Sequence, residues 1–143
     1  GGESTVMNNF LTKTKLNKTI KEYSTNHNVF GTCAGAIIMS TLCDDEKIDC
    51  LKLINVKSFR NSWGRQVHSF DSDLELTFCN EKINAKFIRA PKIKLLSKNN
   101  NILASYKKNP VLVRNDKHLI STFHPELTST ILIHEYFINM INE

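Results

Sequence analysis

The sequence NVFGTCAGAIIMSTL at residues 28–42 carries the most informative pattern in the chain. Residues 28–30 are a candidate for a short buried strand, and residues 36–42 read as a buried helix. Between them lies Gly31-x-Cys33-x-Gly35, in a chain that has only five glycines. Glycine tolerates unusual backbone angles and close approach, so this spacing predicts a sharp turn from strand to helix.

Further elements follow from the spacing of apolar residues on either side of this turn. Residues 5–24 have approximately helical spacing, and residues 129–141 read as an apolar helix. Asn109-Pro110 and Asn115-Asp116 indicate turns. β-Branched and aromatic residues predict strands at 53–59, 74–78, 85–88, 102–106, 111–114 and 119–123. Helices at both ends with strands between them predict a single α/β layered domain over residues 1–143.

The composition fits a soluble globular protein. The chain has 143 residues, of which 41% are hydrophobic and 23% charged. No apolar run approaches the ~18 residues that span a bilayer, and the first residues lack the pattern of a secretory signal. The net charge of +5 comes mainly from scattered lysines. We therefore expect a cytoplasmic protein with a solvated lysine-rich surface, and neither nucleic acid nor membrane as a partner.

Cys33 is the candidate nucleophile. A side chain at the turn between a buried strand and a helix is lifted out of the sheet. The positive end of a helix lowers the pKa of a thiol, and the backbone N–H of Ala34 would point toward a developing oxyanion. A buried structural cysteine in a tight turn is the alternative. Cys43, Cys50 and Cys79 lack this setting and CxxC spacing, so we expect them to be structural free thiols.

A cysteine nucleophile needs a base, and the base needs a group that orients it. Among the five histidines, His124 follows the apolar strand at 119–123, at the strand end where α/β sheets place their sites. Glu126, two residues later, could fix the imidazole tautomer, whereas a structural histidine is the alternative. For the others, we expect His27 at the surface and His118 and His134 as solvated or capping residues, while His68 is ambiguous.

Five motifs occur in one order: GGES at 1–4, GTCAG at 31–35, RNSWGRQVHSF at 60–70, FIRAP at 87–91 and FHPELT at 123–128. This pattern resembles the class I, triad-type glutamine amidotransferases. RNSWGRQ and FIRAP are similar to the branch that forms the glutaminase subunit of pyridoxal 5′-phosphate synthase. The resemblance covers essentially the whole chain and implies a three-layer, flavodoxin-like α/β fold with a mixed central sheet. It also implies that the family's N-terminal segment, with a central strand, is missing.

The resemblance implies a reaction and a catalytic triad. Cys33 would attack the side-chain carboxamide of L-glutamine, His124 would transfer the proton, and Glu126 would orient His124. Water would then hydrolyse the thioester to glutamate. The ammonia would pass through a tunnel to a synthase subunit of TIM-barrel fold, in a hetero-oligomer that makes pyridoxal 5′-phosphate. No cofactor or metal is implied.

The resemblance also assigns binding residues. The backbone N–H groups of Gly2 and Ala34 would form the oxyanion hole. Glu3 would face the substrate ammonium, and a guanidinium suits the carboxylate because it donates paired hydrogen bonds. The full set implied for glutamine is Gly2, Glu3, Ser4, Arg60, Ile88 and Arg89. One departure is His68, which stands where the family usually has an acidic residue.

Two other functions stay open. A class I glutaminase could serve another pathway, such as histidine or anthranilate biosynthesis, although RNSWGRQ and FIRAP argue against this. A chain without the N-terminal segment could instead be a non-catalytic scaffold that binds a partner, although all the triad residues are present.

Overall fold

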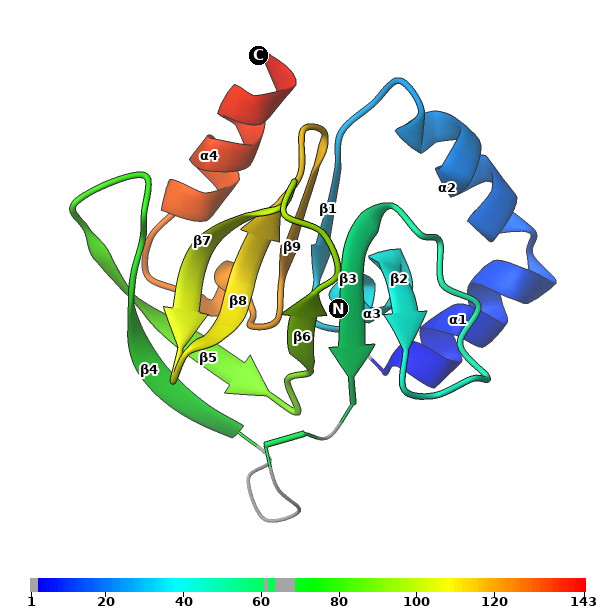
Figure 1. The fold of residues 1–143 in the computed structure, drawn as a ribbon, viewed down its shortest axis with the longest axis horizontal. Coiled ribbons are helices and arrows are strands. Elements are labelled where there is room, and N and C mark those ends of the chain that lie inside the picture. The colour runs from blue at the N-terminus through cyan, green and yellow to red at the C-terminus, as the bar shows by residue number, and fades with distance from the viewer. Residues whose placement is uncertain (1–2, 61, 64–68) are drawn as a thin grey trace.

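The computed structural model describes residues 3–60, 62–63 and 69–143. Within these ranges, no helix is long and apolar enough to cross a membrane. The elements in chain order are α1 (Ser4–Lys13), α2 (Leu16–Ser24), β1 (Val29–Thr32), α3 (Ala34–Met39), β2 (Ser40–Cys43), β3 (Ile54–Phe59), β4 (Ser69–Glu75), β5 (Lys82–Ile88), β6 (Lys92–Leu95), β7 (Asn101–Tyr106), β8 (Asn109–Arg114), β9 (His118–Ser121), the 3₁₀ turn η1 (Pro125–Leu127) and α4 (Leu132–Ile141) (Figure 1).

The strands form a mixed sheet and two smaller sheets. The four-stranded sheet has the order β1-β9-β8-β7, in which β1 and β9 are parallel and the other pairs are antiparallel. A three-stranded sheet has the order β2-β3-β6, and β4 pairs with β5 in an antiparallel ribbon. Figure 1 shows α1 and α2 at one side of the fold and α4 at the other. Strand β9 lies between β1 and β8 in the four-stranded sheet, and all of its residues are buried.

Helix α3 joins the two larger sheets through a shared core. Ala36 and Met39 pack in one apolar cluster with Ile54 of β3, Ile93 of β6 and Ile120 of β9. Helix α3 also packs against β1, so the chain must reverse sharply between these two elements, at Cys33. Burial of these large aliphatic side chains is the main source of stability for this part of the fold.

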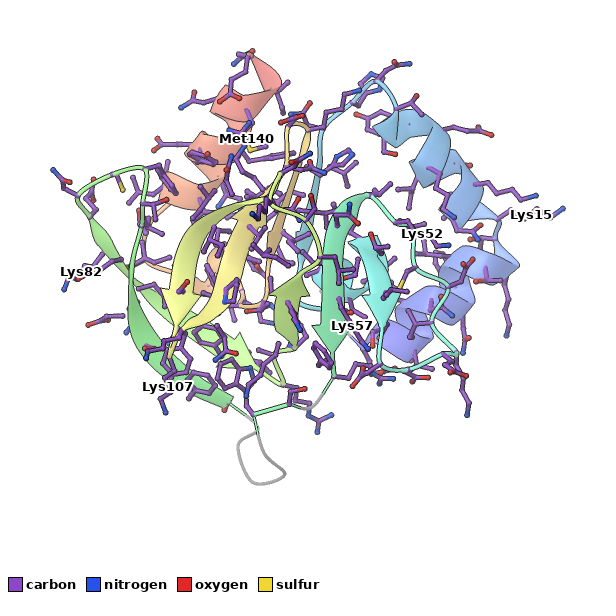
Figure 2. The ribbon with its side chains drawn as sticks, in the orientation of Figure 1. Lys15, Lys52, Lys57, Lys82, Lys107 and Met140 are labelled. Atoms are coloured by element: carbon purple, nitrogen blue, oxygen red, sulfur yellow. The ribbon has the colours of Figure 1, made fainter. Side chains whose placement is uncertain are left out.

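Three exposed lysines lie far apart on the molecule. Figure 2 shows Lys15, Lys82 and Lys107 at separate places around the outside of the molecule. These three lysines belong to different parts of the fold, so they do not gather into one basic patch.

The bounds of the expected helices needed three corrections. The helical spacing at 5–24 belongs to two helices, because Lys15 adopts a left-handed conformation with φ of 60° and separates α1 from α2. The helix expected at 36–42 ends earlier, at Met39, and the next residues form β2. Ser40 is extended there, and its hydroxyl donates to the Ala36 carbonyl at the helix end. The closing helix also begins later than expected, at Leu132.

The strand predictions were right in the core and wrong at polar segments. A strand was expected at 74–78, but the observed strand, β4, lies earlier, at Ser69–Glu75, and shares only two residues with that range. The polar residues of β4 are in a strand because each pairs with a residue of β5. Strand β6 was missed because KIKL is short and half of it is lysine; its Ile93 is buried and pairs with β3.

One turn was also placed wrongly. The chain reverses at Lys107-Lys108, where φ is 46° and 64°, and not at Asn109-Pro110. Asn109 and Pro110 instead begin β8, paired with the end of β7. Asparagine and proline are common in turns, which is why the turn was expected there. The pairing of Tyr106 with Asn109 instead places Lys107 and Lys108 at the turn between the two strands.

Candidate active site

The site is built where two parallel strands end side by side. Thr32, the last residue of β1, pairs with Ser121, the last residue of β9. Cys33 directly follows β1, and its backbone N–H donates to the Ser121 carbonyl at 2.8 Å. His124 follows β9 after two more residues, and its backbone N–H donates to the Lys86 carbonyl of β5 at 3.0 Å. The parallel register therefore brings the ends of two distant segments to one edge of the sheet.

The turn at Cys33 is sharp and sterically constrained. Cys33 has φ of 50° and ψ of −104°, a conformation that non-glycine residues rarely adopt. A Cβ added at Gly31 would lie 2.5 Å from the Met39 sulfur and 2.8 Å from the Gly35 carbonyl carbon. Gly31 is thus required for the close packing of α3 on β1. Gly35 is different, since a Cβ added there would meet nothing within 4 Å.

The Cys33 thiol is buried and contacts the backbone of β5. Its side chain is 6% exposed, and Sγ donates to the Ile88 carbonyl at 3.7 Å. Burial raises the pKa of the Cys33 thiol, and a hydrogen bond from the Ala34 N–H only partly offsets this. The expected lowering of the thiol pKa by the helix is therefore wrong for this structure, because removal of the thiolate from water outweighs the local backbone dipole.

His124 and Glu126 form a hydrogen-bonded pair. The His124 Nδ1 lies 2.7 Å from Glu126 Oε1. His124 directly precedes η1, and Glu126 is the second residue of η1. Burial would raise the pKa of Glu126, but the bond to His124 and the local backbone outweigh it, so the pKa of this carboxyl is lowered. An ionised carboxylate only accepts hydrogen bonds, which places the proton on Nδ1 and leaves Nε2 able to accept one.

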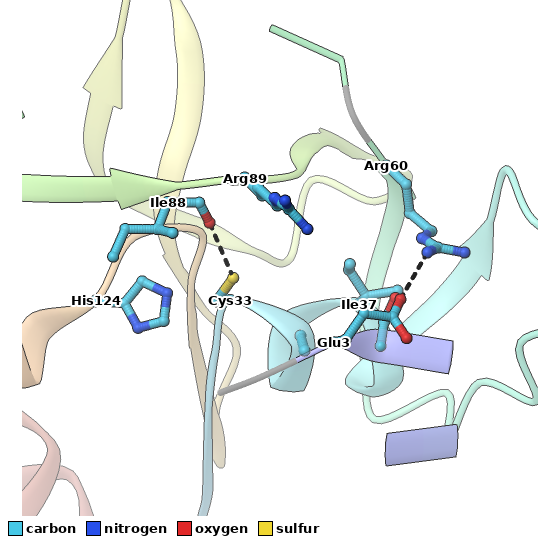
Figure 3. Close-up of a pocket in the computed structure, with 9 residues that line it drawn as sticks. Glu3, Cys33, Ile37, Arg60, Ile88, Arg89 and His124 are labelled. Atoms are coloured by element: carbon cyan, nitrogen blue, oxygen red, sulfur yellow. Dashed lines mark hydrogen bonds and ion pairs between the residues drawn. The ribbon is translucent and has the colours of Figure 1, made fainter. Parts of the chain in front are cut away.

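Cys33 and His124 line one cavity of about 580 Å³. Figure 3 shows the His124 ring and the Cys33 sulfur at one end of it, with Glu3 and Arg60 at the other. A volume of this size admits a small amino acid with room for water. The lining residues are Glu3, Ser4, Cys33, Ala34, Ile37, Arg60, Ile88, Arg89 and His124.

The polar end of the cavity contains an ion-pair cluster. Arg60 Nη2 lies 2.8 Å from Glu3 Oε1, and Arg60 Nη1 lies 2.5 Å from Asp45 Oδ2. Arg89 projects into the same cavity from the turn after β5, where its φ is 45°. The sequence does not indicate Asp45, because its acidic loop resembles a solvated charge run. Ile37 was not predicted to line the site either, although its position on a helix, four residues after Cys33, could have indicated it.

A profile described as the "SNO glutamine amidotransferase family" matches residues 1–143. The chain belongs to the SNO glutamine amidotransferase family. It is similar to "Pyridoxal 5'-phosphate synthase subunit PdxT" of Thermosipho africanus, with 42% identity over 144 residues that cover 100% of this chain and 77% of the relative. The protein of the same name from Francisella philomiragia is 44% identical over 140 residues, or 98% of this chain and 74% of the relative.

A solved structure supports the same family and confirms the fold class. The structure described as "Crystal structure of glutamine amidotransferase" aligns with a TM-score of 0.91 and 35% identity, covering 100% of this chain and 77% of that chain. The expected α/β glutamine amidotransferase fold, with a mixed sheet, is therefore confirmed.

Two of the residues singled out in the sequence lie outside the described part of the chain. They are Gly2, proposed for the oxyanion hole and for glutamine, and His68. His118 was expected to be a solvated or capping residue and is instead buried in β9, where Nδ1 accepts the Val29 N–H at 3.3 Å. Among the described residues, no three histidine, cysteine or acidic side chains are grouped as metal ligands.

Proposed function

We propose that this chain hydrolyses L-glutamine to L-glutamate and ammonia through a thioester on Cys33. One observation carries the proposal. Cys33 and His124 follow two paired parallel strands and line a single cavity, whose other end holds ionic side chains suited to an amino acid. The proposal also agrees with membership of a glutamine amidotransferase family.

The first half of the reaction forms the thioester. Nε2 of His124 accepts the proton of the Cys33 thiol while Sγ attacks the carboxamide carbon of glutamine. The carbonyl π electrons move to oxygen, and the N–H of Ala34, which already lies against the sulfur, donates to this oxyanion. We propose the N–H of Gly2 as the second donor. When the oxyanion collapses, the C–N bond breaks and His124 protonates the departing ammonia.

The second half of the reaction regenerates the enzyme. A water molecule attacks the thioester carbon and gives a proton to His124. The C–S bond then breaks, the sulfur recovers the proton from His124, and glutamate leaves. Glu126 keeps the imidazole in one tautomer and stabilises its positive charge through the 2.7 Å bond.

The remaining lining residues suit the two charged groups on the α carbon of glutamine. Glu3 would receive the ammonium, and the guanidinium of Arg89 would receive the carboxylate. Ser4, Arg60 and the backbone at Ile88 would complete this end of the site, as in the set implied by the family resemblance.

We further propose that the ammonia is passed to a synthase subunit that makes pyridoxal 5′-phosphate. Two relatives over 40% identical carry the name of a pyridoxal 5′-phosphate synthase subunit, which favours this pathway over histidine or anthranilate biosynthesis. The test is release of glutamate from glutamine by the full chain, with and without a TIM-barrel synthase subunit. We expect release that increases when the subunit is added. Absence of release in both conditions would instead support the scaffold function.

A further inference from the structure

Glu3 is held in one orientation by three donors. Its two carboxylate oxygens accept the backbone N–H groups of Thr5 and Val6 at 3.1 and 2.9 Å, which makes Glu3 the N-cap of α1. Oε1 also accepts from Arg60 at 2.8 Å. These bonds, led by that from Thr5, hold the pKa of Glu3 below its usual value. A carboxylate offers about four acceptor sites, so one site remains for a ligand.

Arg60 is held from the opposite side by the loop between β2 and β3. Its Nη1 donates to Asp45, and its backbone N–H donates to Asp44 Oδ1 at 3.0 Å. Asp45 is itself fixed, because its Oδ1 accepts the Lys47 N–H at 3.0 Å and its carbonyl accepts the Ile48 N–H at 3.1 Å. The guanidinium therefore bridges two carboxylates whose own positions are set by backbone hydrogen bonds.

Asp45 lies behind Arg60 relative to the substrate cavity. It does not line the cavity that contains Cys33, but it lines a second hollow, of about 510 Å³, whose wall includes Arg60. Asp45 therefore acts on a ligand only through Arg60, either by fixing the guanidinium or by offsetting its charge.

The charge balance of the cluster decides which end of an amino acid it attracts. Glu3 and Arg60 alone would cancel, and the pair would attract an ammonium only weakly. With Asp45 bound to the other side of Arg60, the cluster carries one more negative than positive charge. Arg89, the other cation of the cavity, forms no ion pair with the described residues. The cavity therefore has a negative end at Glu3 and a positive group at Arg89.

We propose that Asp45 is a specificity-determining positioning residue. By holding and neutralising Arg60, it leaves the Glu3 carboxylate as the net negative charge that receives the α-ammonium of glutamine. This inference rests on the proposed function, since it takes glutamine as the occupant of the cavity. It predicts that Asp45 matters for ligands that carry an α-ammonium and not for those that lack one.

The test compares two ligands in a full-length chain that cannot turn over. In a Cys33→Ala background, the Kd of L-glutamine and of 4-carbamoylbutanoate, which is glutamine without its amino group, is measured by calorimetry. We expect Asp45→Asn to weaken glutamine binding about threefold to fivefold, the effect of a partly exposed ion pair. The Kd of 4-carbamoylbutanoate should change by less than about twofold. The matched control is Glu46→Gln, which removes a charge from the same loop, at an exposed residue that lines the second hollow but is not an ion-pair partner of Arg60.

Three results would overturn the inference. Tighter glutamine binding by Asp45→Asn would show that Arg60 receives the α-carboxylate. Equal weakening of both ligands would show a purely structural role, as would an unchanged Kd for glutamine with a lower melting temperature. Failure of the proposed function is a separate outcome: glutamine would bind in these titrations, but the chain with Cys33 intact would release no glutamate.

Discussion

Replacing Gly31 by alanine tests how the cysteine turn is held. The new Cβ would lie 2.5 Å from the Met39 sulfur and 2.8 Å from both the carbonyl carbon and oxygen of Gly35. Met39 is only 3% exposed, so its side chain has little room to move, and the Gly35 contacts are backbone atoms. The substitution therefore forces α3 away from β1.

The magnitude follows from two opposing effects. Overpacking a core costs about 1–3 kcal/mol, and a required backbone shift places this case near the upper end. Alanine in place of glycine within a strand recovers about 0.5–1 kcal/mol of chain entropy. We expect a net loss of about 2 kcal/mol in the free energy of unfolding, which corresponds to a melting temperature lower by about 5–10 °C for a chain of this size.

The assay is thermal unfolding of Gly31→Ala beside Gly35→Ala, its matched control. A Cβ at Gly35 meets nothing within 4 Å, and alanine is favoured by about 1 kcal/mol in a helix, so the control should melt at or above the original temperature. Glutaminase activity of Gly31→Ala should fall about 100-fold, because ~1 Å of displacement at a reacting group has that effect. A Gly31→Ala chain that melts within about 1 °C of the original would refute the steric reasoning.

Two further predictions concern the histidines. Glu126→Gln should lower kcat by about 10²-fold or more with little change in the melting temperature, because the amide no longer fixes the His124 tautomer or its charge; an unchanged kcat would remove Glu126 from the mechanism. His118 has a pKa lowered first by burial and then by Lys117, so the unfolded chain takes up its proton before the folded chain does. The free energy of unfolding should therefore be independent of His118 titration above the ordinary histidine pKa of about 6.5, and it should decrease as the pH falls below this value. Urea unfolding between about pH 7 and 5 should show this slope, and His118→Gln should flatten it; equal slopes in both chains would contradict the assignment.

The sequence could predict which residues would gather at the site better than it could predict the edges of the elements. Cys33 and His124 each follow a short apolar strand, and α/β sheets bring such strand ends together. The parallel pairing of Thr32 with Ser121, which actually joins them, is a long-range register that local patterns do not contain.

The wrong predictions also come from contacts between segments that are distant in the sequence. His118 follows a charged turn and looked solvated, but its burial is set by β9 lying between β1 and β8. Asp45 lies in an acidic loop, and its contact with Arg60 spans 15 residues of chain. The pKa of Cys33 was misjudged because the sequence shows the start of a helix but not the depth of the thiol.

The most direct test of the account is whether glutamine acylates Cys33. The full chain, alone and with the synthase subunit, is incubated with glutamine, quenched in acid, and digested for mass spectrometry. We predict a γ-glutamyl adduct on the peptide that contains Cys33, with glutamate release lost in Cys33→Ala. Glutamate release that persists in Cys33→Ala, or an adduct on another residue, would contradict the claim that Cys33 is the nucleophile.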